Sequence, residues 1–137
     1  MILQSDLQSV VKLHKIYCDK IEFRRTEAPI LEEHLKCQFA KSYRFNDEHT
    51  FCEVSLGCKF TEDGSDSICI DVIVTGCFSC EDSDRDRRDT LLQKNALAIM
   101  FPYLRTQVSV ITMQPDMNPI VIPPMNIEAV FDQAENF

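Results

Sequence analysis

The residues of this sequence that could carry out chemistry are a few thiols and imidazoles, and the most suggestive pair is Cys77-x-x-Cys80. Two cysteines at this spacing occur in structural zinc sites and in redox motifs. A zinc site needs four ligands, however, and the three histidines (His14, His34 and His49) stand at no ligand spacing. A redox pair normally begins a helix, whereas a charged run follows this one. We therefore interpret Cys77 and Cys80 as ordinary thiols and expect no metal and no cofactor. A small zinc or redox protein is the alternative.

No pattern in the sequence is typical of an enzyme. The three glycines, Gly57, Gly64 and Gly76, are too dispersed to form a loop that cradles phosphates. No serine or cysteine nucleophile motif accompanies a histidine. Seven cysteines, an odd number, and an amino terminus unlike a secretory signal favour reduced thiols and a cytoplasmic location. We predict a protein without enzymatic activity.

The composition is that of one soluble globular domain spanning residues 1–137, with 45% hydrophobic and 26% charged residues. No apolar run reaches the roughly eighteen residues that a membrane span requires. The net charge of −8 disfavours nucleic acid and anionic membranes as partners, because both attract a basic surface.

Four stretches alternate between apolar and polar residues, which is the pattern of a strand with one covered face. They span residues 11–24, 35–45, 52–60 and 68–75. In the first stretch the odd positions are mostly apolar, so we expect them to face the core. Polar residues at 46–49 and Asp63-Gly64 are turn signals between strands. This pattern predicts a four-stranded antiparallel sheet with one solvated face.

The period then changes to that of a long helix over residues 91–113, interrupted by Pro102. The proline should either kink this helix or begin its second half. Ser83 or Asp84, in the charged run before the helix, could cap it. The apolar face is wide enough to predict contact both with the core and with another subunit. That face consists of Leu97, Phe101, Leu104, Val108 and Ile111.

The segment after this helix is the least usual part of the chain, because apolar residues stand in it among four prolines. Prolines lack the backbone donor that a helix or central strand needs, so we expect an ordered loop. Connecting segments are normally polar, and an apolar one should be covered by another subunit or by a ligand. Asn126 can then cap a short C-terminal helix. Strands first and helices last predict an α+β fold.

Four segments carry a resemblance to a known family: IYCDKIEFRRTEAP from Ile16, TGCFSC from Thr75, IMFPYLRTQVS from Ile99 and PPMNIEAVF ending at Phe131. In this order they resemble the SecB family of protein-export chaperones, from Val11 to Phe131. The most specific part is Phe-Pro-Tyr-x-Arg at residues 101–105 with the downstream Pro-x-Asn-Ile-x-x-x-Phe.

The resemblance implies a holdase chaperone, assembled as a homotetramer (a dimer of dimers), that binds unfolded polypeptides without nucleotide. It also implies that the second strand and the apolar loop line a groove for these clients. Methionine suits such a surface because it is unbranched and adaptable. The client-binding residues expected on this basis are Leu35, Cys37, Phe39, Met113, Met117, Ile120, Val121 and Ile122. The alternative is that they complete the core or a subunit interface.

Export-type members of the family hand precursors to SecA, and others guard the antitoxin of a toxin–antitoxin operon. In export-type members SecA docks on the outer face of the sheet through carboxylates. The positions that match in this sequence are Lys20 and Arg24, which are basic, and Asp71, which keeps the acid. The sequence also ends soon after its last helix, without the mobile tail of those members. We therefore expect client holding rather than handover to SecA. The alternative is an interaction subunit or a dedicated chaperone for one folded partner, such as an antitoxin.

Overall fold

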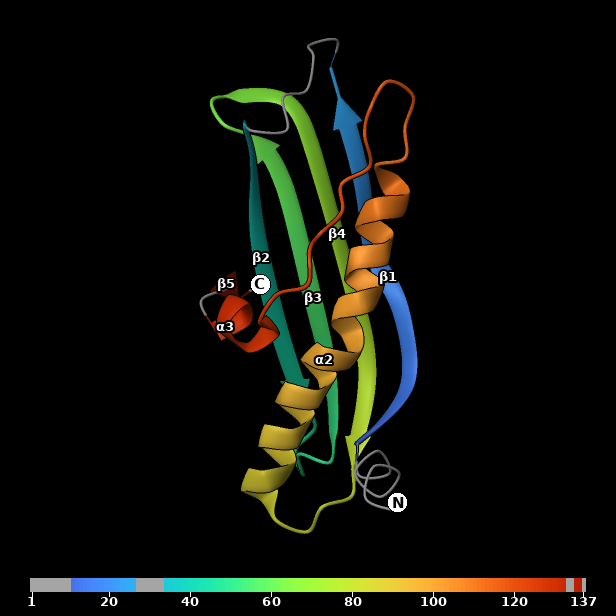
Figure 1. Ribbon diagram of the computed structural model, residues 1–137. Helices are drawn as coiled ribbons and strands as arrows, with labels where there is room; N and C mark the ends of the chain where they lie inside the picture. The colour runs from blue at the N-terminus through green and yellow to red at the C-terminus, as the bar shows by residue number, and fades with distance from the viewer. Residues whose placement is uncertain (1–10, 27–33, 133–134, 137) are drawn as a thin grey trace.

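The computed structural model describes residues 11–26, 34–132 and 135–136 (Figure 1). Four long strands form an antiparallel sheet in the order β1-β4-β3-β2. Their bounds are Val11–Arg25 for β1, Leu35–Phe45 for β2, Phe51–Glu62 for β3 and Ser65–Cys80 for β4. The predicted four-stranded antiparallel sheet is confirmed. A two-residue strand that the sequence did not reveal, β5 (Glu135–Asn136), adds to β2 in parallel at Ala40 and Lys41.

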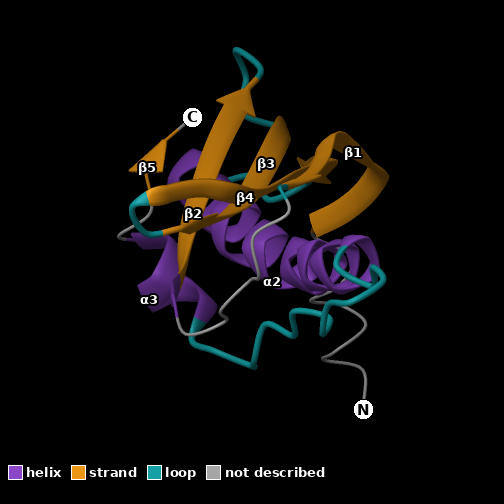
Figure 2. Cartoon of the chain, turned by 90° about the horizontal axis from the view of Figure 1, so that it is seen from above, coloured by secondary structure: helices purple, strands orange, loops and turns teal. Residues whose placement is uncertain are grey.

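Both described helices cover one face of this sheet (Figures 1 and 2). The long helix α2 spans Arg85–Ile111 and the short helix α3 spans Ile127–Asp132. Asp84 caps α2 as predicted, because its carboxylate accepts a hydrogen bond from the backbone N–H of Asp86 at 3.0 Å. The helix begins at Arg85, earlier than its apolar period indicated, and continues through Pro102. No helix in the described part of the chain is long and apolar enough to cross a membrane.

The two central strands, β3 and β4, provide the sheet side of the core. The alternation of β4 directs Ile70, Val72 and Val74 at α2, and each is at most 1% exposed. Together with Ile68, which is 1% exposed, they form the apolar face of β4 that the alternation over residues 68–75 predicts. At the turn into β4, Gly64 has a φ of 71°, which a glycine adopts without steric cost, so the Asp63-Gly64 turn signal is confirmed as well.

The edge strand β1 departs from its predicted alternation. Its register with β4 shifts between Leu13 and Lys15 and again between Cys18 and Lys20. Each bulge adds one residue and exchanges the faces of the strand. Ile16 therefore pairs with Gly76 on the core side, whereas Tyr17 is exposed on the other side. The prediction that odd positions face the core is wrong for the middle of β1.

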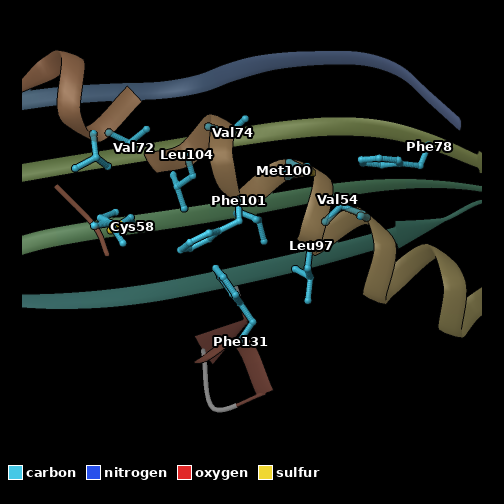
Figure 3. Packing of buried hydrophobic residues seen from close by; sticks show 14 of the residues in the cluster. Val54, Cys58, Val72, Val74, Phe78, Leu97, Met100, Phe101, Leu104 and Phe131 are labelled. Carbon is cyan, nitrogen blue, oxygen red and sulfur yellow. The ribbon is translucent and has the colours of Figure 1, made fainter. Parts of the chain in front are cut away.

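The helical side of the core comes from one face of α2, and Figure 3 shows its side chains directed at Val54, Val72 and Val74 of the sheet. These residues are at most 6% exposed: Leu97, Phe101, Leu104 and Val108. Their predicted place in the core is confirmed. Burial within the chain leaves these four side chains almost no free surface for contact with another subunit. Ile111 at the end of the helix is half-buried.

The charged run that leads into the first turn of α2 contains a structural arginine, Arg88. The Arg88 guanidinium donates hydrogen bonds to the carbonyl oxygens of Glu48 and His49 at 3.0 and 3.1 Å. It also donates to those of Asp82 and Ser83, at 2.9 and 3.2 Å. Arg88 thus connects the turn between β2 and β3 to the start of α2.

We predict that Arg88→Met lowers the free energy of unfolding by about 2 kcal/mol, because four carbonyl groups lose a charged donor. Urea unfolding followed by circular dichroism measures this loss. The matched control is Arg87→Met, since Arg87 is exposed and makes a single 3.7 Å ion pair with Asp82. Equal stability losses in the two variants would contradict the role assigned to Arg88.

Candidate functional site

The apolar loop, residues 113–126, obtains its backbone hydrogen bonds from side chains of α2 and its C-cap. Arg105 Nε donates to the Ile122 carbonyl at 2.9 Å, and Ser109 Oγ donates to the Ile120 carbonyl at 2.9 Å. The backbone N–H of Ile120 donates to the buried hydroxyl of Thr112 at 2.8 Å. These bonds hold the loop extended alongside the helix, from the end of α2 towards α3 (Figure 1).

The start of the loop is tied to the far end of β1. The guanidinium of Arg25 donates to the carbonyl oxygens of Pro115 and Asp116 at 3.3 and 3.4 Å. Gln114 Nε2 donates to the carbonyl of Ile111 at 2.9 Å, so the loop is also fastened to the last turn of α2. Side chains thus hold this proline-rich segment at several points along its length.

An extended backbone directs successive side chains to opposite sides, and the loop shows this alternation. Ile120 is half-buried, Val121 is 71% exposed and Ile122 is 4% exposed. Met117 shares the inner side with Ile120, whereas Met113 is 62% exposed. The structure therefore divides the predicted client-binding residues between two surfaces. Ile122 is part of the core, so its side chain offers almost no surface to a client.

Residues of β2 and residues on the inner side of the loop border the same core cluster. Leu35, Cys37 and Phe39 lie on the core face of β2, opposite Glu62, Phe60 and Cys58 of β3. Cys37 is exposed, and the other two are half-buried against the core. We define the apolar strip by its members, which are partly exposed and adjoin one core cluster: Leu35, Cys37, Phe39, Met117 and Ile120.

Phe39 is only partly exposed, and its ring also packs against rings of both helices. Its ring lies 5.4 Å from the Phe131 ring of α3 and 6.3 Å from the Phe101 ring of α2, measured between ring centroids. Phe101 and Phe131 meet edge to face at 6.0 Å, and Figure 3 shows both rings beside β2. Such clusters stabilise packing beyond their buried area. Phe39 therefore docks α3 onto the sheet at one end of the apolar strip.

The second surface lies where the loop and α2 face away from the sheet. A depression of about 350 Å³ there is lined by residues of both segments, among them Pro102 and Arg105. Its exposed apolar side chains form the outer patch: Val110, Met113 and Val121. These three side chains line the same depression.

On the other face of the sheet, two of the three predicted docking residues form an ion pair. Lys20 Nζ lies 2.8 Å from Asp71 Oδ2, and that hydrogen bond and charge raise the pKa of Lys20. Glu22 adds a second carboxylate at 3.8 Å from the same ammonium group. Arg24 stands apart, opposite Cys69. The carboxylate of Asp71 is therefore already neutralised by Lys20 of the same chain.

The two cysteines of the Cys-x-x-Cys motif lie on opposite faces of β4. Residues three apart on a strand point in opposite directions, and Cys80 is buried in the core whereas Cys77 is partly exposed on the outer face. They cannot share one metal ion or form a disulfide in this strand. The thiols that the fold does bring together are Cys37 and Cys58, 3.4 Å apart between sulfur atoms. No spacing in the sequence indicates this pair.

Comparison with known proteins gives a consistent result. The family model described as "Preprotein translocase subunit SecB" matches residues 4–136. An uncharacterized protein of Methanocaldococcus jannaschii is 24% identical over 97% of this chain and 90% of its own length. The protein-export protein SecB of Magnetococcus marinus is 24% identical over 88% of this chain and 82% of its own length.

One solved structure has a similar fold. It is a SecB-like chaperone of Mycobacterium tuberculosis in complex with a ChAD peptide from the antitoxin HigA1. The similarity covers 92% of this chain and 100% of that one, with a TM-score of 0.67 and 15% identity. At 15% sequence identity, the similarity shows that the two chains share the arrangement of the sheet and helices.

We predict that Thr112→Val loosens the loop. Valine keeps the shape of threonine but leaves the backbone N–H of Ile120 without its acceptor, which costs about 1–3 kcal/mol of stability. Limited proteolysis should then cut between residues 113 and 126 faster than in the unmodified chain. The matched control is Thr106→Val on the exposed side of α2. Unchanged cleavage in Thr112→Val would contradict this role of the hydroxyl group.

Proposed function

This chain belongs to the SecB family, and we propose that it is a holdase that binds unfolded polypeptides along the apolar strip without using nucleotide. SecB-family chaperones are not enzymes, and SecB-like chaperones bind polypeptides. The observation that supports the proposal is the apolar strip itself, which keeps part of its surface open although it packs against the core.

The physical basis is the burial of client side chains against a surface that is already in place. Full burial of one large apolar side chain contributes about 1.5–3 kcal/mol, so a half-exposed residue offers roughly half of that. The loop is extended before the client arrives, because its prolines and its hydrogen bonds to α2 fix it. Met117 can adjust its shape to different client side chains. Such a surface favours apolar segments of many sequences over one defined partner.

The electrostatics of the outer sheet face support client holding without handover to SecA. Lys20 neutralises Asp71, and Arg24 adds an exposed positive charge to the same face. A basic partner that docks on carboxylates would meet positive charges at Lys20 and Arg24. The carboxylates of Glu22 and Asp71 already share the Lys20 ammonium group. We accordingly propose a chaperone that acts in the cytoplasm on unfolded clients in general. A dedicated client, such as an antitoxin, is the variant that the Mycobacterium tuberculosis complex suggests.

We propose that the outer patch, rather than the buried face of α2, contacts other subunits in a homotetramer built as a dimer of dimers. Val110, Met113 and Val121 supply exposed apolar surface for this contact. The competing proposal is an interaction subunit that binds one folded protein. A stable complex with one folded partner, and no affinity for unfolded chains, would favour that alternative.

We predict that the purified assembly suppresses aggregation of a chemically unfolded protein diluted into buffer, without nucleotide. Light scattering measures the suppression. Aggregation that proceeds unchanged at a molar excess of the assembly would refute the holdase proposal.

The Met117→Ser variant tests where clients bind. We expect client affinity to fall by about tenfold, since one apolar contact is lost. The matched control is Phe51→Ser, which removes a 53% exposed apolar side chain from the outer face of the sheet. It should retain full affinity, measured by titration of a fluorescent unfolded client. Equal losses in the two variants would show that clients do not use the apolar strip.

A further inference from the structure

Two free thiols touch each other, one in the apolar strip and one in the core beneath it. Cys37 on β2 and Cys58 on β3 lie 3.4 Å apart, measured between their sulfur atoms. Cys37 is opposite Phe60 and Cys58 is opposite Phe39, so the thiols are diagonal neighbours on the core face of the sheet. Among the described residues, all seven cysteines included, this is the pair whose sulfur atoms are in contact.

The two thiols have different environments. Cys58 is 1% exposed, whereas Cys37 is open to solvent. The hydrogen bond between the two sulfur atoms lowers the pKa of Cys37, and the same bond together with burial raises the pKa of Cys58. Cys37 is thus the thiol of the pair that an oxidant in solution can reach and the one more readily deprotonated, and Cys58 lies buried behind it.

The neighbouring thiols are less suited to oxidation. Burial raises the pKa of Cys52 to about 12, and burial also raises the pKa of Cys18. Cys77 is partly exposed, but it lies on the outer face of the sheet, away from Cys80. A reactive thiol with a second thiol in contact is the arrangement that converts to a disulfide rather than to higher oxides.

We propose that Cys37 and Cys58 form a redox modification site at which a peroxide converts the two thiols into a disulfide. The Cys37 thiolate attacks one peroxide oxygen, so that an S–O bond forms, the O–O bond breaks and the released hydroxide takes a proton to become water. The Cys58 thiol then attacks the Cys37 sulfur. The S–S bond forms, the S–O bond breaks, and the departing hydroxide leaves with the Cys58 proton as a second water. Two electrons pass from the thiols to the peroxide.

Closing this bond moves the strand. Diagonal neighbours have Cα atoms about 7–8 Å apart, whereas a disulfide needs about 4.4–6.8 Å. Because β2 and β3 already lie at hydrogen-bonding distance, the segment of β2 around Cys37 must slide along β3, and among the described strands β5 pairs only with Ala40 and Lys41 on its other side. This movement displaces Leu35 and Phe39, which flank Cys37 in the apolar strip. Oxidation should therefore weaken client binding, a consequence that rests on the proposed holdase function.

The test uses the full chain in its native assembly, treated with hydrogen peroxide and then reduced with dithiothreitol. The intact mass should fall by two hydrogen atoms per chain, and peptide mapping after thiol blocking should find Cys37 joined to Cys58. Cys37→Ser, on the surface, should abolish this link, as should the buried variant Cys58→Ala. The control Cys77→Ser should keep it. A link between other cysteines, or Cys37 oxidised to a sulfinic acid without a link, would overturn the proposal.

The effect of oxidation on client binding is measured separately. Oxidation should weaken client binding by about tenfold, the loss expected for one apolar contact, and reduction should restore it. Full affinity in the linked protein would overturn the coupling to client binding. If the Cys37–Cys58 link forms but the reduced protein binds no client, the holdase function fails and the redox site stands. If the reduced protein binds clients and no link forms, the redox site fails and the holdase function stands.

Discussion

The structure depends on how a segment that cannot form its own secondary structure is held in place. Four prolines exclude the loop after α2 from helix and sheet, so its backbone groups need partners elsewhere. Arg105, Ser109 and Thr112 supply them, and all three lie on α2 or directly at its end. The loop is consequently fixed in an extended form over the same face of the sheet that α2 covers. An apolar segment held in this way packs on one side only.

That constraint explains why one short segment contributes to two surfaces. Because the backbone is extended, Ile120 turns inward beside Met117, while Val121 turns outward. The inner side completes a strip with β2 that we assign to unfolded clients, and the outer side forms a patch with Val110 that we assign to other subunits. The apolar strip lies between the core and solvent. A small displacement of β2 therefore changes the apolar surface that a client can contact. The contact between Cys37 and Cys58 places a chemically sensitive group at that position.

The sequence predicted features that depend on neighbouring residues. The four strands, the Asp84 cap and the Asp63-Gly64 turn follow from local periodicity and backbone preference. The features that the sequence did not predict depend on contacts between segments that are distant along the chain. The bulges of β1 are a property of its register with β4, the burial of Ile122 depends on Arg105, and the thiol contact depends on the register of β2 with β3. Apolar character alone did not distinguish buried Ile122 from exposed Val121.

The most direct test of the account is methyl NMR spectroscopy of the assembly during titration with an unfolded client. Resonances of Leu35, Met117 and Ile120 should shift with client concentration, whereas those of buried Val72 and of Val121 on the outer patch should stay in place. Shifts confined to Val121 and Met113, with the methyl groups of the apolar strip unchanged, would contradict the claim that the inner side of the loop is where clients bind.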